Sequence, residues 1–367
     1  MAAVKDEISP ALAARLASEL TRSWPPFPTR DFARGLDAAL EPLALMARVE
    51  LLTDRLAEAL PGDFVTAAKV LWSTLDSPGF TGWMTLPCGN YVARAGIDRP
   101  DVALPLLAGL TPRWSSEGPI RPFIERHPSL TYEHLRRWVS DPDEHVRRLV
   151  SEGTRPRLPW APRLRPLIAD PTPNIELLDR LVDDPSPYVR RSVGNHLNDI
   201  SKDHPDLTLD LAERWLHRGD GAAWAVRHGV RTLVKQGDTR ALDVLGARAD
   251  ADIRLTALAV DRETVAIGEA VTFSLTVELV GTTEADAVID YRVSYMGASG
   301  LRRPKVFKLT RRRLAPGRPT TVTRRHRFEH VSIRRIHPGP HTLEIQVNGH
   351  IVGSAQINVV DPRTPEH

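Results

Sequence analysis

The chain of 367 residues lacks several features that would place it in common protein classes. Its single cysteine, Cys88, excludes an internal disulfide and a metal site built from several cysteines, and it fits a reducing compartment. No apolar segment follows the N-terminal MAAVK, and no run of about 18 apolar residues occurs, so the sequence predicts neither a secretory signal nor a membrane span. It also lacks a glycine-rich phosphate loop and histidines at metal-ligand spacing. We therefore expect a cytoplasmic monomer with no cofactor, no metal ion and no membrane contact.

Lysine is also scarce, since the chain has 6 lysines and 43 arginines, and the positive charge is unevenly placed. Between Leu301 and Arg335 there are 13 basic residues and one acidic residue, Glu329. A block of this kind favours binding to a polyanion. The alternative is that a GC-rich genome raises arginine use, but that bias would act along the whole chain.

An internal repeat organises the middle of the sequence. LRRWVSDPDEHVRRLVSEGT starts at Leu135, and LDRLVDDPSPYVRRSVGNHL starts 43 residues later at Leu178. A looser third copy, AERWLHRGDGAAWAVRHGVRTLV, follows. A helix, an Asp-Pro turn and a second helix at this period predict a HEAT-like solenoid of stacked helical pairs.

After the repeats the apolar period changes from 3.6 to 2, which indicates strands. We expect the boundary near Ala249 to Asp252, with a helical domain over 1–250 and a β-sandwich over 251–367. The sandwich should have about seven strands, immunoglobulin-like in number and spacing. Asn348-Gly349 predicts a tight hairpin turn. The strands are expected at 271–279, 288–296, 305–312, 321–329, 341–349 and 351–360.

The basic block falls on two of these strands. We expect segments 302–313 and 321–335 to be adjacent strands, so that their arginines share one edge and contact DNA phosphates. The candidate contacts in this domain are Arg311, Arg312, Arg313, Arg324 and Arg325.

Charged residues also recur on the second helix of each repeat, and these helices should line one groove. Arg148 and Glu152 are four residues apart, and Arg191 and Asp199 lie on one face of the next helix. Basic residues mixed with carboxylates suit a groove that processes nucleic acid, whereas the alternative is an ordinary solvated helix pair. The candidate phosphate contacts here are Arg147, Arg148, Arg190 and Arg191.

Between the two clear repeats lies SEGTRPRLPWA, residues 151–161. Pro156 and Pro159 must end the preceding helix, because proline lacks a donor and its ring excludes the preceding turn. Trp160 therefore lies on a rigid extended segment, where its indole either plugs a core or faces a ligand.

Three stretches, WSSEGPIRPFIERHP, SEGTRPRLPWAPRL and DDPSPYVRRSVGNHLNDISKDHPD, resemble the AlkC branch of the HEAT-like-repeat DNA alkylation-repair glycosylases. The resemblance covers most of residues 20–240, and the strand-rich tail is similar to the immunoglobulin-like domain of some members. Carried over residue by residue, it implies that Glu117, Glu152, Trp160 and Asp199 are the functional residues. For Glu117, capping of a helix near Pro119 is an equal alternative.

The resemblance implies a DNA glycosylase that acts on double-stranded DNA containing alkylated bases. A non-catalytic HEAT scaffold that binds DNA or a protein is the alternative, although buried acids would repel a ligand that is only bound. No lysine lies between Lys69 and Lys202, so we expect no amine in the groove and an intact abasic product.

Overall fold

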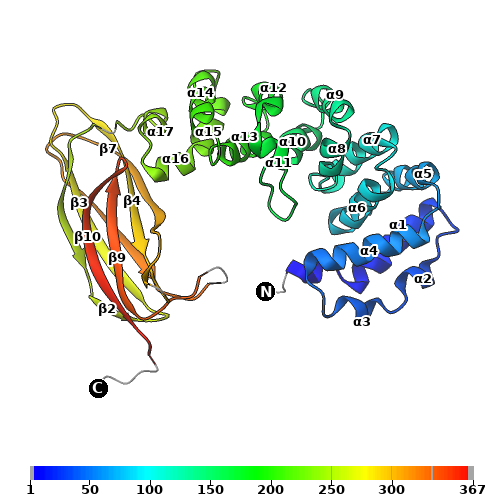
Figure 1. Cartoon of the computed structure of the whole chain (residues 1–367), viewed down its shortest axis with the longest axis horizontal. Helices are drawn as coiled ribbons and strands as arrows, with labels where there is room; N and C mark the ends of the chain where they lie inside the picture. Colours follow the sequence, from blue (N-terminus) through cyan, green and yellow to red (C-terminus); the bar gives the residue numbers. More distant parts are fainter. Residues whose placement is uncertain (1–3, 249, 299, 332–333, 363–367) are drawn as a thin grey trace. The chain divides into compact units, whose positions relative to one another are not determined.

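The structure is a computed structural model that describes residues 4–248, 250–298, 300–331 and 334–362. Helices form the first part of the chain and strands the last (Figure 1), which confirms the expected order of a helical region and a β-rich region. The chain divides into two compact units, Met1–His204 with Arg214–Gly229, and Pro205–Glu213 with Val230–His367. Ala249, at the expected domain boundary, lies outside the described residues.

Most of the helices are short, and none in the described ranges is both long and apolar enough to span a membrane. Three of them are 3₁₀ helices, η1 (Val4–Glu7), η2 (Gly82–Met84) and η3 (Thr111–Arg113). The α-helices are α1 (Pro10–Ser23), α2 (Thr29–Ala33), α3 (Leu36–Leu40), α4 (Leu45–Ala59), α5 (Phe64–Thr74), α6 (Thr85–Ala95), α7 (Pro100–Leu110), α8 (Arg121–Arg126), α9 (Pro128–Trp138), α10 (Glu144–Gly153), α11 (Arg165–Ala169), α12 (Thr172–Leu181), α13 (Pro187–Ile200), α14 (Pro205–Trp215), α15 (Asp220–Gly229), α16 (Arg231–Gln236) and α17 (Thr239–Val244).

The sequence repeat corresponds to the helical pairs α9–α10 and α12–α13. In each Asp-Pro turn the aspartate accepts a hydrogen bond from the backbone two residues on, Asp141 from Asp143 at 2.9 Å and Asp184 from Ser186 at 2.8 Å. Asp143 and Ser186 then cap the second helix with their own side chains. The shared sequence is thus a side-chain turn followed by an N-cap, and it starts the second helix at the same place in each repeat.

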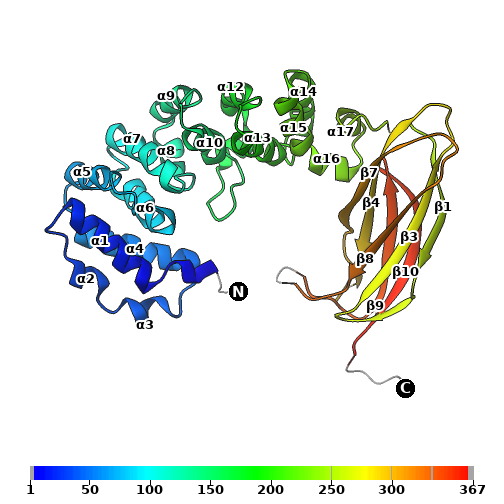
Figure 2. The same ribbon diagram turned by 180° about the vertical axis from the view of Figure 1, so that it is seen from behind.

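The second helices α10, α13 and α15 are neighbours, with α13 packed between the other two (Figures 1 and 2). Val189, Val193 and Leu197 of α13 are fully buried, and each contributes about 1.5–3 kcal/mol of hydrophobic stabilisation. Gly194 permits a close approach of α15, because a Cβ there would lie 2.8 Å from the carbonyl oxygen of Ala225. The predicted stacking of helical pairs is confirmed.

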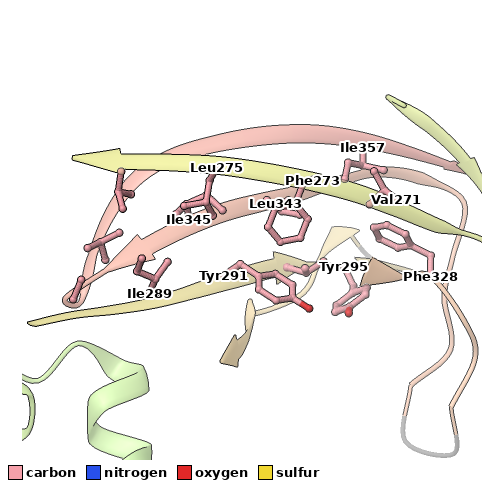
Figure 3. Packing of buried hydrophobic residues seen from close by; sticks show 14 of the residues in the cluster. Val271, Phe273, Leu275, Ile289, Tyr291, Tyr295, Phe328, Leu343, Ile345 and Ile357 are labelled. Atoms are coloured by element: carbon pink, nitrogen blue, oxygen red, sulfur yellow. The ribbon is translucent and has the colours of Figure 1, made fainter. Parts of the chain in front are cut away.

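The strands form a sandwich whose two sheets have the orders β1-β3-β8 and β2-β10-β9-β4-β7, and β5 and β6 form a separate two-stranded sheet. The apolar side chains between the two sheets, among them Phe273, Tyr291 and Phe328, make its core (Figure 3). The strands are β1 (Ile253–Val260), β2 (Thr264–Ala266), β3 (Ala270–Leu279), β4 (Ala285–Ser294), β5 (Met296–Gly297), β6 (Gly300–Leu301), β7 (Lys305–Leu314), β8 (Thr320–Arg327), β9 (Gly339–Val347) and β10 (His350–Val360).

The two arginine-rich segments are not adjacent strands, and that expectation is wrong. β7 pairs with β4 in one sheet, whereas β8 pairs with β3 in the other. The chain crosses between the sheets after Leu314, and Phe307 of β7 and Val322 of β8 pack against the same core. The expected strand over 321–335 ends at Arg327, and residues 332–333 lie outside the described residues. β1, the edge strand at the start of the sandwich, was not predicted from the sequence.

The predicted hairpin turn is confirmed, since β9 and β10 pair antiparallel with Val347 opposite His350. Asn348 and Gly349 both have positive φ, 42° and 84°, as a two-residue turn of this kind requires. The turn also packs on Gly237, the C-cap of α16, where an added Cβ would lie 3.0 Å from the Cα of Gly349. This close approach needs glycine on both sides, and it joins α16 to the sandwich within the second unit.

Candidate active site

The loop that follows α10, residues 154–164, is held in place by a buried arginine of α8. Arg121 donates through Nη1 to the carbonyl oxygens of Gly153 and Arg155, at 3.0 and 2.7 Å. Its Nε and Nη2 donate to the carbonyl oxygen of Pro162, at 3.1 and 2.7 Å. Burial lowers the pKa of Arg121 to about 10. One side chain thus fixes both ends of the loop.

Trp160 lies in this loop, which leaves the row of helices between α10 and α11 (Figure 1). Its side chain is not part of a core, since Trp160 is 72% exposed, and the core-plug alternative is therefore wrong. Its φ is 62°, in the left-handed region that bulky residues rarely adopt. A strained residue persists where its surroundings hold it, and such residues cluster at functional sites.

Two of the four predicted catalytic residues are buried carboxylates joined by one guanidinium. Asp199, in the last turn of α13, is 2% exposed, and Glu152, in the last turn of α10, is 5% exposed. Arg155 donates from Nε to Oδ2 of Asp199 at 2.9 Å and from Nη1 to Oε1 of Glu152 at 2.6 Å. The arginine therefore sets the separation of the two carboxylates.

Each carboxylate has further donors. Ser192 donates from Oγ to Oε2 of Glu152 at 2.5 Å, and Nζ of Lys202 donates to Oδ1 of Asp199 at 3.0 Å. Nη2 of Arg148 lies 3.5 Å from Oε1 of Glu152. Because Glu152 is buried among these donors, the alternative of a solvated Arg148–Glu152 pair is wrong.

Glu117 extends the same chain of charges. Its carboxylate forms an ion pair with Arg148 and accepts a hydrogen bond from Oγ of Ser115 at 2.8 Å. The hydrogen bonds that its carboxylate accepts come from the side chains of Ser115 and Arg148, and none from the backbone of the following helix α8 is found among the described residues. Glu117, Glu152 and Asp199 are thus connected through alternating cations. The order along the chain of ion pairs is Glu117, Arg148, Glu152, Arg155, Asp199 and Lys202.

Burial and charge act together on the groups around this chain. Burial by itself lowers the pKa of Arg155, but Glu152 and Asp199 raise it above its ordinary value overall. Burial lowers the pKa of His196, which is fully enclosed beside Asp199 on α13, to about 4. His196 bonds through Nδ1 to the carbonyl oxygen of Ser151 at 2.9 Å, so it ties α13 to α10. Within the described ranges, no three His, Cys, Asp or Glu side chains are grouped to hold a metal ion.

Arg147 and Arg190, both predicted to contact phosphates, bond inside the repeats. Arg147 donates to both carboxylate oxygens of Asp184, at 2.7 and 3.0 Å, and to the carbonyl oxygens of its own Asp-Pro turn. Arg190 donates to the carbonyl oxygens of the equivalent turn, Asp184 and Pro185. The repeated arginine thus braces the turn, which explains its place in both copies, and we propose no DNA contact for these two residues.

The other predicted DNA contacts are exposed, with the exception of Arg148. Arg191 is exposed on α13, whereas Arg148 is mostly covered by its carboxylate partners. In the sandwich, Arg311 pairs with Asp286, and Arg313 pairs with Glu284. The remaining three, all of them exposed, are Arg312, Arg324 and Arg325.

Comparison with known proteins adds to this geometry. A family model described as a DNA alkylation repair enzyme matches residues 114–233, and one described as the C-terminal Ig-like domain of the uncharacterised protein YhaZ matches residues 254–361. The uncharacterised protein YhaZ of Bacillus subtilis (strain 168) is 33% identical over 360 residues, which are 98% of this chain and 100% of YhaZ. The Pseudomonas fluorescens alkylpurine DNA glycosylase AlkC, in a structure bound to DNA containing an abasic site analogue, is 35% identical, with a TM-score of 0.93 over 98% of this chain and 100% of AlkC.

This chain belongs to the AlkC-type DNA alkylation repair family. In this AlkC-type chain, the region that matches the repair-enzyme model contains Glu117, Glu152, Trp160 and Asp199. The region that matches the Ig-like model contains the basic block of the sandwich. The resemblance inferred from the three sequence stretches is therefore confirmed, as is the fold class of a helical repeat region followed by an immunoglobulin-like domain.

Four residues of the site in this AlkC-type chain were not predicted from the sequence. They share a role as donors to the carboxylates or to the loop backbone. One signal was available for Arg155, which follows Glu152 by three residues in the segment that must leave the helix. An arginine that becomes buried requires a charged partner, and Glu152 is close in the sequence. The missed residues are Arg121, Arg155, Ser192 and Lys202.

Proposed function

We propose that this chain is a monofunctional DNA glycosylase that removes cationic N-alkylated bases from duplex DNA as a step of base excision repair. The bases belong to the class of 3-methyladenine, 3-methylcytosine and 1-methyladenine. The observation that carries the proposal is the pair of buried carboxylates, Glu152 and Asp199, bridged by Arg155. The protein acts in this proposal as a cytoplasmic monomer, and its single, buried cysteine is compatible with a reducing compartment.

The chemistry suits a cationic base. Its positive charge already weakens the glycosidic bond, so the base leaves without a general acid. The transition state then transfers positive charge to the deoxyribose, and a carboxylate near C1′ stabilises that charge and orients the attacking water. Such a site needs carboxylates held in a fixed position, because preorganised charges cost no rearrangement during the reaction.

We assign the main role to Asp199 and a second role to Glu152. Each oxygen of Asp199 accepts one donor in the structure, and a carboxylate has about four acceptor positions, so the group retains capacity for a water or a sugar. Glu117 completes the set of carboxylates through Arg148. The exposed indole of Trp160 offers a π face to the cationic nucleotide or its sugar.

We also propose that the two regions of the chain have different roles. The helical region, residues 1–250, carries the reaction, and the immunoglobulin-like region, residues 251–367, binds flanking duplex through its exposed arginines. Arg191 on α13 supplies a phosphate contact beside the carboxylates. The support for the second region is its exposed, unevenly basic surface.

The test is release of bases from methylated duplex DNA by the purified protein. We expect Asp199→Asn to abolish release in single-turnover assays while DNA affinity stays equal or rises slightly, because the change removes a negative charge. Asp203→Asn is the matched control, since Asp203 pairs with Arg157 nearby but outside the chain of carboxylates. Binding of DNA without any base release by the unchanged protein would favour the non-catalytic scaffold instead.

A further inference from the structure

Trp224, on α15, is a large aromatic side chain that the fold leaves open to solvent. It is 44% exposed, although an indole gains free energy from burial. Its ring is stacked on the imidazole of His228, one turn later, with the ring centroids 5.2 Å apart and the planes inclined at 9°. Nε2 of His228 in turn donates to Oδ1 of Asn195 on α13 at 3.0 Å. The imidazole is thus fixed to the neighbouring helix and supports one face of the indole.

Trp224 continues a row of residues that starts at the candidate active site. Arg148 of α10, Arg191 of α13 and Trp224 of α15 are each the fifth residue of their helix. One turn later, Asn195 and His228 share the ninth position, and the hydrogen bond between them joins the two helices on this face. Trp224 therefore lies on the face that carries Arg148 and Arg191.

Two arginines flank the indole. Arg191 occupies the equivalent position on α13, and Arg227 follows Trp224 by three residues, a spacing that places it beside the indole on α15. Both arginines are exposed, and neither forms an ion pair with any residue that the structure describes. Asp220 carries the opposite charge one turn before Trp224, in the first turn of α15, where a carboxylate stabilises the helix dipole. An exposed indole between two guanidinium groups suits a ligand that combines apolar surface with negative charge.

We propose that Trp224, Arg191 and Arg227 bind the sugar–phosphate backbone of duplex DNA beside the lesion. A deoxyribose ring packs against the indole, and the guanidinium groups bind phosphates. The faces of the bases are stacked on one another in a duplex, so the apolar surface that its backbone offers is that of the sugars. Contacts to phosphate and sugar position a protein on DNA without reading its sequence. The inference rests on the proposed function for its ligand, duplex DNA, and extends the binding surface to α15.

The position of α15 fits this role. The 154–164 loop lies on the same side of α9 and α12 as α10, α13 and α15 do (Figures 1 and 2). α15 packs on α13, which carries Asp199. Packed helices lie about 8–10 Å apart, and the major groove of DNA alone is about 12 Å wide. One duplex is therefore wide enough to contact both helices.

The test measures the affinity of the full-length protein for unmodified duplex DNA, and for a duplex with an abasic analogue, at several salt concentrations. We expect Trp224→Ala to weaken binding by about 5-fold or more, the loss typical of an energetically important interface residue. Its salt dependence should not change, because the indole is uncharged. Trp224→Phe should keep most of the affinity, since it retains an aromatic face. Melting curves will identify a variant that fails to fold.

Arg227→Gln should instead change the salt dependence. The slope of the logarithm of the association constant against the logarithm of the salt concentration should become shallower by about 0.9, the value for one phosphate. Methylphosphonate, an uncharged substitute for phosphate, is then placed at one position after another on both strands. At the phosphate that Arg227 contacts, the substitution should weaken binding by the unchanged protein but not by Arg227→Gln.

Two variants serve as matched controls, because their residues lie outside the row of second helices α10, α13 and α15. The control for the indole is Trp72→Ala, since Trp72 on α5 is 41% exposed. The control for the guanidinium group is Arg136→Gln, since Arg136 on α9 lies 3.2 Å from the carboxylate of Glu176. Both controls should bind DNA as the unchanged protein does.

The proposal is overturned if Trp224→Ala and Arg227→Gln bind DNA as the two controls do, or if no methylphosphonate position distinguishes Arg227→Gln from the unchanged protein. Base release from methylated duplex DNA by the unchanged protein is measured in parallel. DNA binding that depends on Trp224, without base release, supports this surface and contradicts the proposed function. Base release together with binding that does not depend on Trp224 leaves the proposed function intact and removes this surface.

Discussion

Nζ of Lys202 lies 3.0 Å from Oδ1 of Asp199, just beyond the C-terminal end of α13. The absence of lysine between Lys69 and Lys202 predicted that the groove holds no amine, and that prediction is wrong, because Lys202 itself reaches the site. The amine is, however, an ammonium paired with a carboxylate. An ammonium has no free electron pair, so it does not attack the abasic sugar while the pair persists.

We therefore still expect an intact abasic product. Borohydride should trap no covalent complex between the unchanged protein and methylated duplex DNA, and Lys202→Met should give the same result. If a complex is trapped with the unchanged protein and is absent with Lys202→Met, Lys202 leaves Asp199 during the reaction and forms a Schiff base. The enzyme would then be bifunctional.

Arg155→Lys should slow base release by about 100-fold, the order of effect expected when a catalytic group is misplaced by about 1 Å. A lysine ammonium can pair with Asp199 or Glu152, but it lacks the planar fork that bonds both. Arg157→Lys is the control, since Asp203 is the one partner of Arg157 among the residues that the structure describes. Single-turnover rates measure the effect, and equal rates for the two variants would remove Arg155 from its positioning role.

Trp160→Ala should impair discrimination between alkylated and unmodified DNA without unfolding the protein, because the indole is already exposed. Trp160→Gly should raise the free energy of unfolding by about 1 kcal/mol, since glycine adopts the positive φ of this position without strain. Thermal melting and competition binding measure the two effects. Unchanged discrimination by Trp160→Ala would exclude a role of the indole in recognising the lesion.

His196 makes the stability of the helical unit depend on pH. Burial lowers its pKa to about 4 from its ordinary value of 6.5, so between these values the unfolded chain binds more protons than the folded one. The free energy of unfolding should therefore fall as the pH decreases from 6.5 towards 4. The contribution of His196 to this fall is up to about 1.4 kcal/mol per pH unit. His196→Gln should flatten this slope in denaturant titrations, and an unchanged slope would show that other groups cause it.

Two exposed arginines test the role of the sandwich. Arg312 on β7 and Arg325 on β8 form no ion pair within the described residues. Replacing both by glutamine should make the DNA association constant less sensitive to salt. The slope of its logarithm against the logarithm of the salt concentration should become shallower by roughly 0.9 for each phosphate that the protein no longer neutralises. Arg248→Gln with Arg254→Gln is the control, because each of these arginines already pairs with an aspartate. Equal slopes for the two double variants would exclude phosphate contacts at Arg312 and Arg325.

The sequence by itself determined the features that depend on residues close together in the chain. The Asp-Pro turn and its N-cap are made by hydrogen bonds over two residues, so the start of each second helix could be predicted. The Asn348-Gly349 turn likewise needs only its own backbone angles. The order of helices and strands follows from apolar periodicity, which is also local.

Only the tertiary structure decided which charges meet and which strands pair. Arg155 and Asp199 are 44 residues apart, and their contact depends on how α13 packs beside α10. The separation of β7 and β8 into two sheets depends on which side of the core each strand covers. Trp160 lies exposed in a loop whose two ends are hydrogen-bonded by Arg121, a residue of another helix. Such contacts depend on the free energy of packing the whole domain, and a pattern in a short stretch of sequence does not predict that free energy.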